Sequence, residues 1–182
     1  MDKELITKPI VLIGVMGVGK TTIGMKLAQK LQLPFIDTDV EVAKKAGCSI
    51  ADIFKYQGEE YFVNLETLVI QEWLKEIIVI STGGKGFAIP KNRVLIKEQA
   101  ISIWLKVSFD ILYERVSRKK TRPLLEQGNK AVILRDLIQK LYPIYAEADI
   151  TITSGDMSHN VIVDTIISAL SRYIDVSTNT SK

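Results

Sequence analysis

The chain has 182 residues, which is enough for one domain with a substantial core and too few for two domains of typical size. Its formal net charge of +3 suits a protein that handles small anions, but it is too small to indicate a nucleic acid or a membrane surface as a partner. The single cysteine, Cys48, excludes an internal disulfide bond and fits a reducing cytosol.

Neither a structural zinc site nor a targeting segment is expected. With one cysteine and one histidine, His159, the chain lacks the Cys/His cluster of such a site. We expect Cys48 to be a small packing residue and His159 a polar surface residue before the last helix. The first residues, Met-Asp-Lys-Glu-Leu, are too short and too acidic for a signal peptide, and no apolar run approaches the ~20 residues that cross a bilayer. We therefore expect a cytoplasmic protein.

The most informative segment lies near the start of the chain. Residues 10–13, Ile-Val-Leu-Ile, form an apolar, β-branched run that is typical of a buried parallel strand. Residues 14–21, Gly-Val-Met-Gly-Val-Gly-Lys-Thr, match the pattern G-x-x-x-x-G-K-[ST] in full, and an amphipathic helical pattern follows them. Strand, glycine loop and helix in this order are the context of a phosphate-binding P-loop.

We expect this loop to bind a nucleoside triphosphate together with Mg²⁺. Glycines let the backbone curl until its N–H groups point at phosphate oxygens, and the helix directs the positive end of its dipole to the same place. Lys20 can reach the β- and γ-phosphates, and the Thr21 hydroxyl can bind Mg²⁺. The expected nucleotide-binding residues of this segment are Gly14, Gly17, Val18, Gly19, Lys20, Thr21 and Thr22.

The rest of the chain alternates short strands with helices. Strands are expected over residues 33–37, 77–80, 101–105 and 149–153. Helices are expected over residues 40–46, 49–58, 59–75, 91–97, 108–117, 131–146 (interrupted near Pro143) and 160–173, and residues 176–182 are expected to be a polar, disordered tail. This alternation predicts one α/β domain: a three-layer P-loop NTPase fold with a five-stranded parallel sheet flanked by helices.

Polar loops follow three of the expected strands at their carboxyl ends, where ligands bind in parallel sheets. One is the P-loop, the second carries Asp37 and Asp39, and the third is the turn Gly83-Gly84. Beside a Mg²⁺-bound triphosphate, one carboxylate can hold a metal-bound water and the other can accept the proton of an attacking hydroxyl. Alternatively, Asp39 only caps the helix that follows it. The convergence of three such loops predicts an enzyme.

A basic run at the end of the helix over residues 108–117 leads to Arg122-Pro123. We interpret residues 115–130 as a mobile lid that places the Arg122 guanidinium over the transferring phosphate and excludes water. Pro123 stiffens the loop and limits where the arginine points. The alternative is a solvated basic helix end that complements its own dipole, which suffices for Lys119 and Lys120.

With these segments in order, the chain resembles the shikimate kinase family of P-loop kinases over nearly its whole length. The resemblance rests on residues 14–22, 37–39, 49–54, 58–59, 82–84, 122–125 and 143–145, with Phe62 and Glu66. It implies MgATP-dependent phosphorylation of a hydroxyl of shikimate, in aromatic amino-acid biosynthesis, by a monomer with a mobile lid.

The resemblance also implies roles for individual residues. Thr21 would bind Mg²⁺ directly and Asp37 would hold it through water. Asp39 would bind the substrate hydroxyls and act as the base, the Gly83-Gly84 turn would contact substrate through the Gly84 backbone, and Arg122 would contact ATP. The catalytic residues are then Asp39, Lys20 and Arg122.

The chain departs from the family pattern on the acceptor side. Val63 and Leu141 stand where the family has the two arginines that hold the shikimate carboxylate, and Lys85 replaces the third glycine of the turn. Lys85 and Lys140 lie next to these positions, and either could supply a compensating charge, although a lysine does not reproduce the bidentate fork of an arginine.

Two other functions are therefore compatible with the sequence. One is a related kinase for another polyol acid such as gluconate, and the other is a nucleotide-binding paralogue that has lost transfer activity. Retention of Lys20, Thr21, Asp37, Asp39 and Arg122 argues against the second of these.

Overall fold

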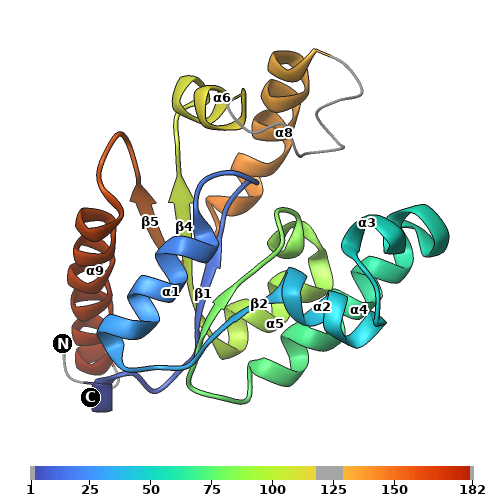
Figure 1. Ribbon diagram of the computed structural model, residues 1–182. Helices are drawn as coiled ribbons and strands as arrows, with labels where there is room; N and C mark the ends of the chain where they lie inside the picture. Colours follow the sequence, from blue (N-terminus) through green and yellow to red (C-terminus); the bar gives the residue numbers. More distant parts are fainter. Residues whose placement is uncertain (1–2, 118–128, 181–182) are drawn as a thin grey trace.

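A computed structural model describes residues 3–117 and 129–180 of the chain (Figure 1). Arg122 and most of the predicted lid lie outside the described residues. The strands are β1 (Ile10–Ile13), β2 (Phe35–Asp37), β3 (Val79–Ser81), β4 (Ile101–Lys106) and β5 (Ile150–Thr153). The helices are α1 (Lys20–Leu31), α2 (Thr38–Ala46), α3 (Ile50–Asp52), α4 (Gly58–Trp73), α5 (Pro90–Gln99), α6 (Phe109–Ser117), α8 (Lys130–Tyr145) and α9 (His159–Thr180), with a π-helical turn over Ile53–Gln57 and 3₁₀ turns over Lys3–Leu5 and Gly86–Ala88.

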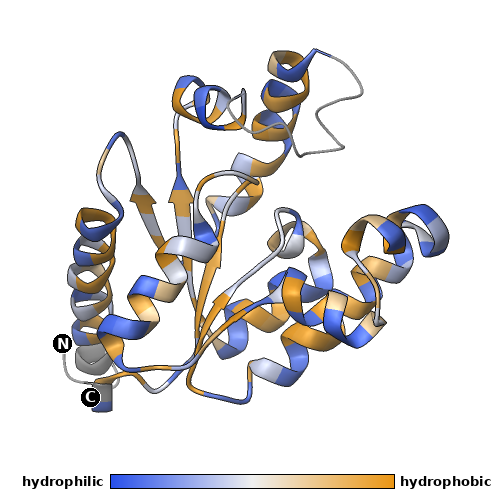
Figure 2. Ribbon diagram, viewed as in Figure 1, coloured by the Kyte–Doolittle hydropathy of each residue, from blue (hydrophilic) through white to orange (hydrophobic). Residues whose placement is uncertain are grey.

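The five strands form one parallel sheet in the order β2-β3-β1-β4-β5, which confirms the predicted fold class. Helices lie on both sides of this sheet (Figure 1). Every residue of β1 and β3 is buried, as expected for strands covered on both faces, and both strands are apolar along most of their length (Figure 2). Helix α1 packs on β3 and on α9, and α9 also contacts β5.

A second, smaller apolar cluster lies beside the main core. Its buried members are Val42 of α2, Ile53 of the π-helical turn and Val69 of α4, and Phe62 and Leu65 pack against them. This cluster holds α2, α3 and α4 together next to the edge strand β2 (Figure 1). The segment that follows β2 therefore has a packed support of its own.

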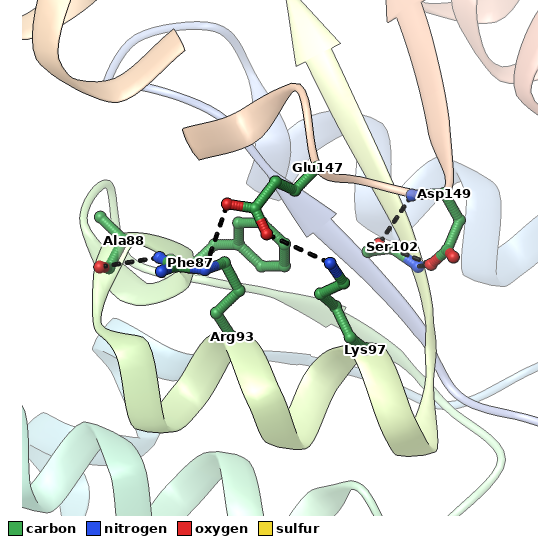
Figure 3. A network of polar contacts seen from close by, with 7 residues as sticks. All are labelled: Phe87, Ala88, Arg93, Lys97, Ser102, Glu147 and Asp149. Carbon is green, nitrogen blue, oxygen red and sulfur yellow. Dashed lines mark hydrogen bonds and ion pairs between the residues drawn. The ribbon is translucent and has the colours of Figure 1, made fainter. Parts of the chain in front are cut away.

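At the other edge, β5 alternates between buried and exposed side chains, with Ile150 and Ile152 facing the core. Asp149, just before β5, links this strand to β4 through hydrogen bonds with Ser102 (Figure 3). Asp149 Oδ2 accepts hydrogen bonds from the backbone N–H and the hydroxyl of Ser102, at 2.8 and 2.6 Å. Close by, the exposed side chain of Glu147 pairs with Lys97 and Arg93 of α5.

Several predicted boundaries are wrong, and local chemistry explains them. Helix α9 extends to Thr180, so the predicted disordered tail is helical up to that residue; no glycine or proline interrupts residues 160–180. Pro143 lies inside α8 instead of interrupting it, only two residues before the helix ends. Cys48 is exposed rather than packed, because Gly47 ends α2 with a left-handed φ of 68° and turns the chain at the surface. Among the described residues, none of the helices combines the length and the apolar character needed to cross a membrane.

The two acidic residues before β5 allow a matched stability test. We expect Asp149→Ala to destabilise the fold by about 2 kcal/mol, because it leaves the buried N–H of Ser102 without its acceptor. Glu147→Ala should cost less than about 1 kcal/mol, because its ion pairs are exposed to solvent. Urea midpoints of the two variants measure the difference, and equal midpoints would contradict this account.

Candidate functional site

The P-loop connects β1 to α1 and needs glycine at two points for different reasons. Gly19 precedes the first turn of α1 with a left-handed φ of 98°, which glycine adopts without strain. At Gly14, a Cβ atom would lie 3.0 Å from the carbonyl oxygen of Leu105 in β4, so only glycine allows this close approach. The loop therefore presents backbone rather than side chains at the start of α1.

Lys20, the first residue of α1, is directed back across this loop. Its side chain is largely buried, and Nζ donates hydrogen bonds to the carbonyl oxygens of Gly14 and Val15 at 2.7 and 3.2 Å. The ammonium group thus lies beside the backbone of the P-loop, where a bound phosphate would gain from its charge. This position agrees with the role predicted for Lys20.

Thr21 and Asp37 meet at the end of β2. The Thr21 hydroxyl donates a 2.6 Å hydrogen bond to Asp37 Oδ2, and Asp37 Oδ1 accepts one from the backbone N–H of Asp39. Asp37, not Asp39, is therefore the cap of α2, so the alternative that we considered for Asp39 is wrong. Asp39 lies in the first turn of α2.

A hydroxyl and a carboxylate held side by side are oxygen ligands of the kind that Mg²⁺ prefers, and they fit a site that is completed by phosphate oxygens and water. Within residues 3–117 and 129–180, no group of three or more His, Cys, Asp or Glu side chains could hold a metal by itself. The two oxygens of Thr21 and Asp37 fit a Mg²⁺ ion that arrives with the nucleotide.

The glycine turn after β3 is anchored from two helices. The hydroxyl of Tyr145, near the end of α8, donates a hydrogen bond to the carbonyl oxygen of Gly84. From α4, the carboxylate of Glu66 accepts a 3.0 Å hydrogen bond from the N–H of Gly83. A Cβ atom on Gly83 would lie 2.9 Å from Asp39 Oδ1, so Asp39 is directed at this turn.

Most of the predicted residues line one cavity of about 260 Å³. Its walls include Gly17, Gly19, Lys20, Thr21, Thr22, Asp37, Asp39 and Gly84, together with Met16, Ser81 and Thr82. Five of the predicted residues that the structure describes do not line the cavity: Gly14, Val18 and Gly83 are buried, and Lys85 and Lys140 are exposed. The predicted donor residues and the predicted base thus share one cavity.

Of the three positions that depart from the family pattern, Val63 and Leu141 carry no charge. Leu141 is buried in the main core and Val63 is half-buried on α4. Lys85, in contrast, is close to the turn and makes a 2.8 Å ion pair with Glu59 at the start of α4. An ammonium group has three donors, so this pairing leaves Lys85 able to bind a second carboxylate.

Sequence reasoning missed two residues near the cavity. His159 is exposed, as expected, but its Nε2 lies only 3.8 Å from where a Cβ on Gly19 would stand, beside the P-loop. No local signal could reveal this, because it depends on how the segment after β5 approaches α1. Glu66 was noted only as a family landmark, yet it is charged and lies on the same face of α4 as the apolar residues Phe62, Val69 and Ile70, which is a signal of a buried polar role.

Burial raises the pKa of Glu66 from its ordinary value of 4.5 to about 7, and the nearby charge of Asp39 acts in the same direction. Hydrogen bonds from Thr38 and Gly83 and the charge of Lys20 oppose this shift. A carboxyl group that titrates near neutrality thus lies directly behind the cavity.

Comparison with known proteins agrees with this geometry. The family model described as shikimate kinase matches residues 16–171. The chain belongs to the shikimate kinase family. A shikimate kinase from Rhodopseudomonas palustris is 44% identical over 168 residues, which cover 92% of this chain and 83% of that protein.

Comparison with solved structures supports the same family fold. A shikimate kinase from Acinetobacter baumannii in complex with shikimate is 35% identical and superposes with a TM-score of 0.87, over 93% of this chain and 97% of that one. A gluconokinase from Sinorhizobium meliloti 1021 covers 97% of this chain and 99% of that one with a TM-score of 0.64, but at 18% identity it shows only a shared fold. The chain is a kinase of the shikimate kinase family, with an alcohol as acceptor.

The raised pKa of Glu66 predicts a pH-dependent stability. Because the folded pKa lies above the unfolded one, the protonated carboxyl favours folding, and this contribution is present below pH 4.5 and lost as the pH rises through about 7. Relative to Glu66→Gln, the wild-type protein should lose about 2–3 kcal/mol of stability between pH 5 and pH 8.

Urea unfolding of both proteins at the two pH values measures this effect. Glu60→Gln, at an exposed position of the same helix, is the matched control and should show no such change. A difference between wild type and Glu66→Gln that stays constant with pH would show that the carboxyl is not held in this way.

Proposed function

We propose that this protein transfers the γ-phosphoryl group of ATP to a hydroxyl of shikimate. The observation that carries the proposal is the single cavity in which the P-loop, the Thr21–Asp37 pair and Asp39 meet beside the Gly83-Gly84 turn. Identity of 44% to a shikimate kinase over most of the chain supports the choice of acceptor. In this reaction the acceptor oxygen forms a bond to the γ-phosphorus, and the bond from that phosphorus to the β,γ-bridging oxygen breaks.

On the donor side, the backbone N–H groups of residues 14–22 would hold the phosphates, and Lys20 would neutralise the charge on the γ-phosphate. Thr21 would bind Mg²⁺ directly, and Asp37 would hold it through water. A bound Mg²⁺ ion would supply positive charge that offsets the charge developing on the phosphate oxygens. Arg122, outside the described residues, would contact ATP from the lid over residues 115–130.

On the acceptor side, Asp39 would accept the proton of the attacking hydroxyl. Its carboxylate is directed at the glycine turn, where the backbone of Gly84 would contact the substrate and hold the hydroxyl within reach. The kinase would act as a cytoplasmic monomer on a small molecule, in keeping with the small net charge of +3.

The acid group of the substrate needs a cation that Val63 and Leu141 do not provide. We assign this role to Lys85, which follows Gly84 in the glycine turn and forms an ion pair with Glu59. Lys140 is the second candidate. Each charge-assisted hydrogen bond is worth about 1.5–3 kcal/mol, so one lysine recovers part of what two arginines would supply.

The acceptor is tested by release of ADP with shikimate, gluconate and nucleoside monophosphates in parallel. We expect turnover with shikimate and none above background with the other two. Selective turnover of gluconate would contradict shikimate as the acceptor and would identify the protein as a kinase for another polyol acid. ATP binding without acceptor-stimulated turnover would favour a paralogue that has lost transfer activity.

The role of Asp39 is tested by Asp39→Asn, which keeps the shape of the side chain and removes its basicity. We expect kcat to fall by about 10²–10⁴-fold, the usual contribution of a general base, while the Kd for ATP stays close to that of the wild type. Initial rates and ATP titration calorimetry measure the two quantities. Near-normal turnover would remove Asp39 as the base.

The two lysines are tested by Lys85→Ala and Lys140→Ala. Loss of the cation that binds the carboxylate should raise the KM for shikimate by about 10–100-fold with little change in the KM for ATP. Lys44→Ala, at an exposed site on α2, is the control. Unchanged shikimate KM values in both variants would show that neither lysine compensates for the arginines.

A further inference from the structure

The carboxyl group of Glu66 joins three segments of the site. Its Oε1 atom accepts one hydrogen bond from the N–H of Gly83 and one from the hydroxyl of Thr38, each at 3.0 Å. The N–H of Gly83 also lies 2.8 Å from the Thr38 hydroxyl oxygen. These contacts form a closed triangle between α4, the residue between Asp37 and Asp39, and the first glycine of the acceptor turn.

The triangle is tightly packed. A Cβ atom on Gly83 would lie 2.6 Å from Glu66 Oε1, and one on Gly86 would lie 2.9 Å from the same oxygen. The carboxyl group is therefore in contact with backbone at both ends of the turn, and Glu66 itself is only 1% exposed. A displacement of this group would have to displace the turn.

Glu66 does not line the cavity, so it would act on bound substrates through other residues. The apolar side chain of Val63, one turn earlier in α4, cannot form a hydrogen bond to the Glu66 carboxyl group. Glu66 Oε2 has no hydrogen-bond partner among the residues that the structure describes. The bonds that Glu66 does make are thus directed entirely at Thr38 and Gly83. Any effect on the reaction would pass through Asp39 and Gly84, the neighbours of those two residues.

We propose that Glu66 is the positioning residue of the acceptor site: its carboxyl group fixes the glycine turn relative to the base Asp39. Reacting groups must be held to within about 1 Å, and an error of that size can cost about 10²-fold in rate. The hydrogen bonds of Glu66 join the segment that carries Asp39 to the glycine turn. The separation of these two segments sets the distance between the proposed base and the substrate hydroxyl. The kinetic part of this inference rests on the proposed function.

The kinetic test compares Glu66→Gln, which keeps an acceptor oxygen in a side chain of the same shape, with Glu66→Met, which removes it. We expect Glu66→Met to raise the shikimate KM and lower kcat by about tenfold each, with the Kd for ATP within about twofold of wild type. Glu66→Gln should rescue both constants to within about threefold. Thr67→Val, at the adjacent residue, is the control, because the Thr67 hydroxyl donates its hydrogen bond to the carbonyl of Val63 within the same helix.

A second readout needs no substrate and decides the positioning role even if shikimate proves not to be the acceptor. Amide hydrogen exchange at Gly83 should be slow in wild type and Glu66→Gln and at least tenfold faster in Glu66→Met, because one of its two acceptors is lost. If Glu66→Met does not fold, Thr38→Val removes another corner of the triangle and should accelerate the same exchange. A folded Glu66→Met with wild-type Gly83 exchange and wild-type kinetics would overturn the proposal.

Discussion

The parallel register of β2, β3 and β1 is the constraint on which the rest of the structure depends. Asp37 pairs with Ser81, and Ser81 pairs with Leu12, so the three strands end at nearly the same level of the sheet. Each strand then leads into a different polar segment: the P-loop, the Asp37–Asp39 segment and the glycine turn. A shift of one residue would turn every side chain of a strand to the other face of the sheet, where it would meet a different set of packed neighbours. Packing of the sheet thus brings the predicted donor and acceptor groups together.

The two halves of the cavity differ in how they are held. On the donor side the geometry is local: glycine conformations and the start of α1 arrange the backbone within one continuous segment. The acceptor side is assembled from distant parts, with Tyr145 of α8 on Gly84, and Glu66 of α4 on Gly83 and Thr38. The departures from the family pattern, at Val63, Lys85 and Leu141, fall on this assembled side, and the proposed compensation by Lys85 would act there.

This difference also explains what could be predicted from the sequence. The P-loop and the five strands follow from local patterns, and the rule that ligands bind at strand ends brings the Asp37–Asp39 segment to the P-loop. The assignment of Thr21 and Asp37 to Mg²⁺ follows from the resemblance to the shikimate kinase family. The contact of Glu66 with Gly83 and the approach of His159 to Gly19 depend on tertiary packing, which no local pattern contains. The cap of α2 is Asp37 because its side chain reaches the N–H of Asp39, and the choice between two aspartates two residues apart depends on where β2 ends. The extension of α9 to Thr180 differs from the predicted disordered tail because a polar composition without glycine or proline still allows a helix to continue.

The central claim is that one cavity holds both the nucleotide and shikimate, with Asp39 between them. A crystal structure of the protein with ADP and shikimate tests it most directly. The account predicts the β-phosphate of ADP against the N–H groups of residues 14–22, and a shikimate hydroxyl within about 2.6–3.2 Å of an Asp39 carboxylate oxygen. Shikimate bound away from Asp39 and Gly84, or found only outside this cavity, would contradict it.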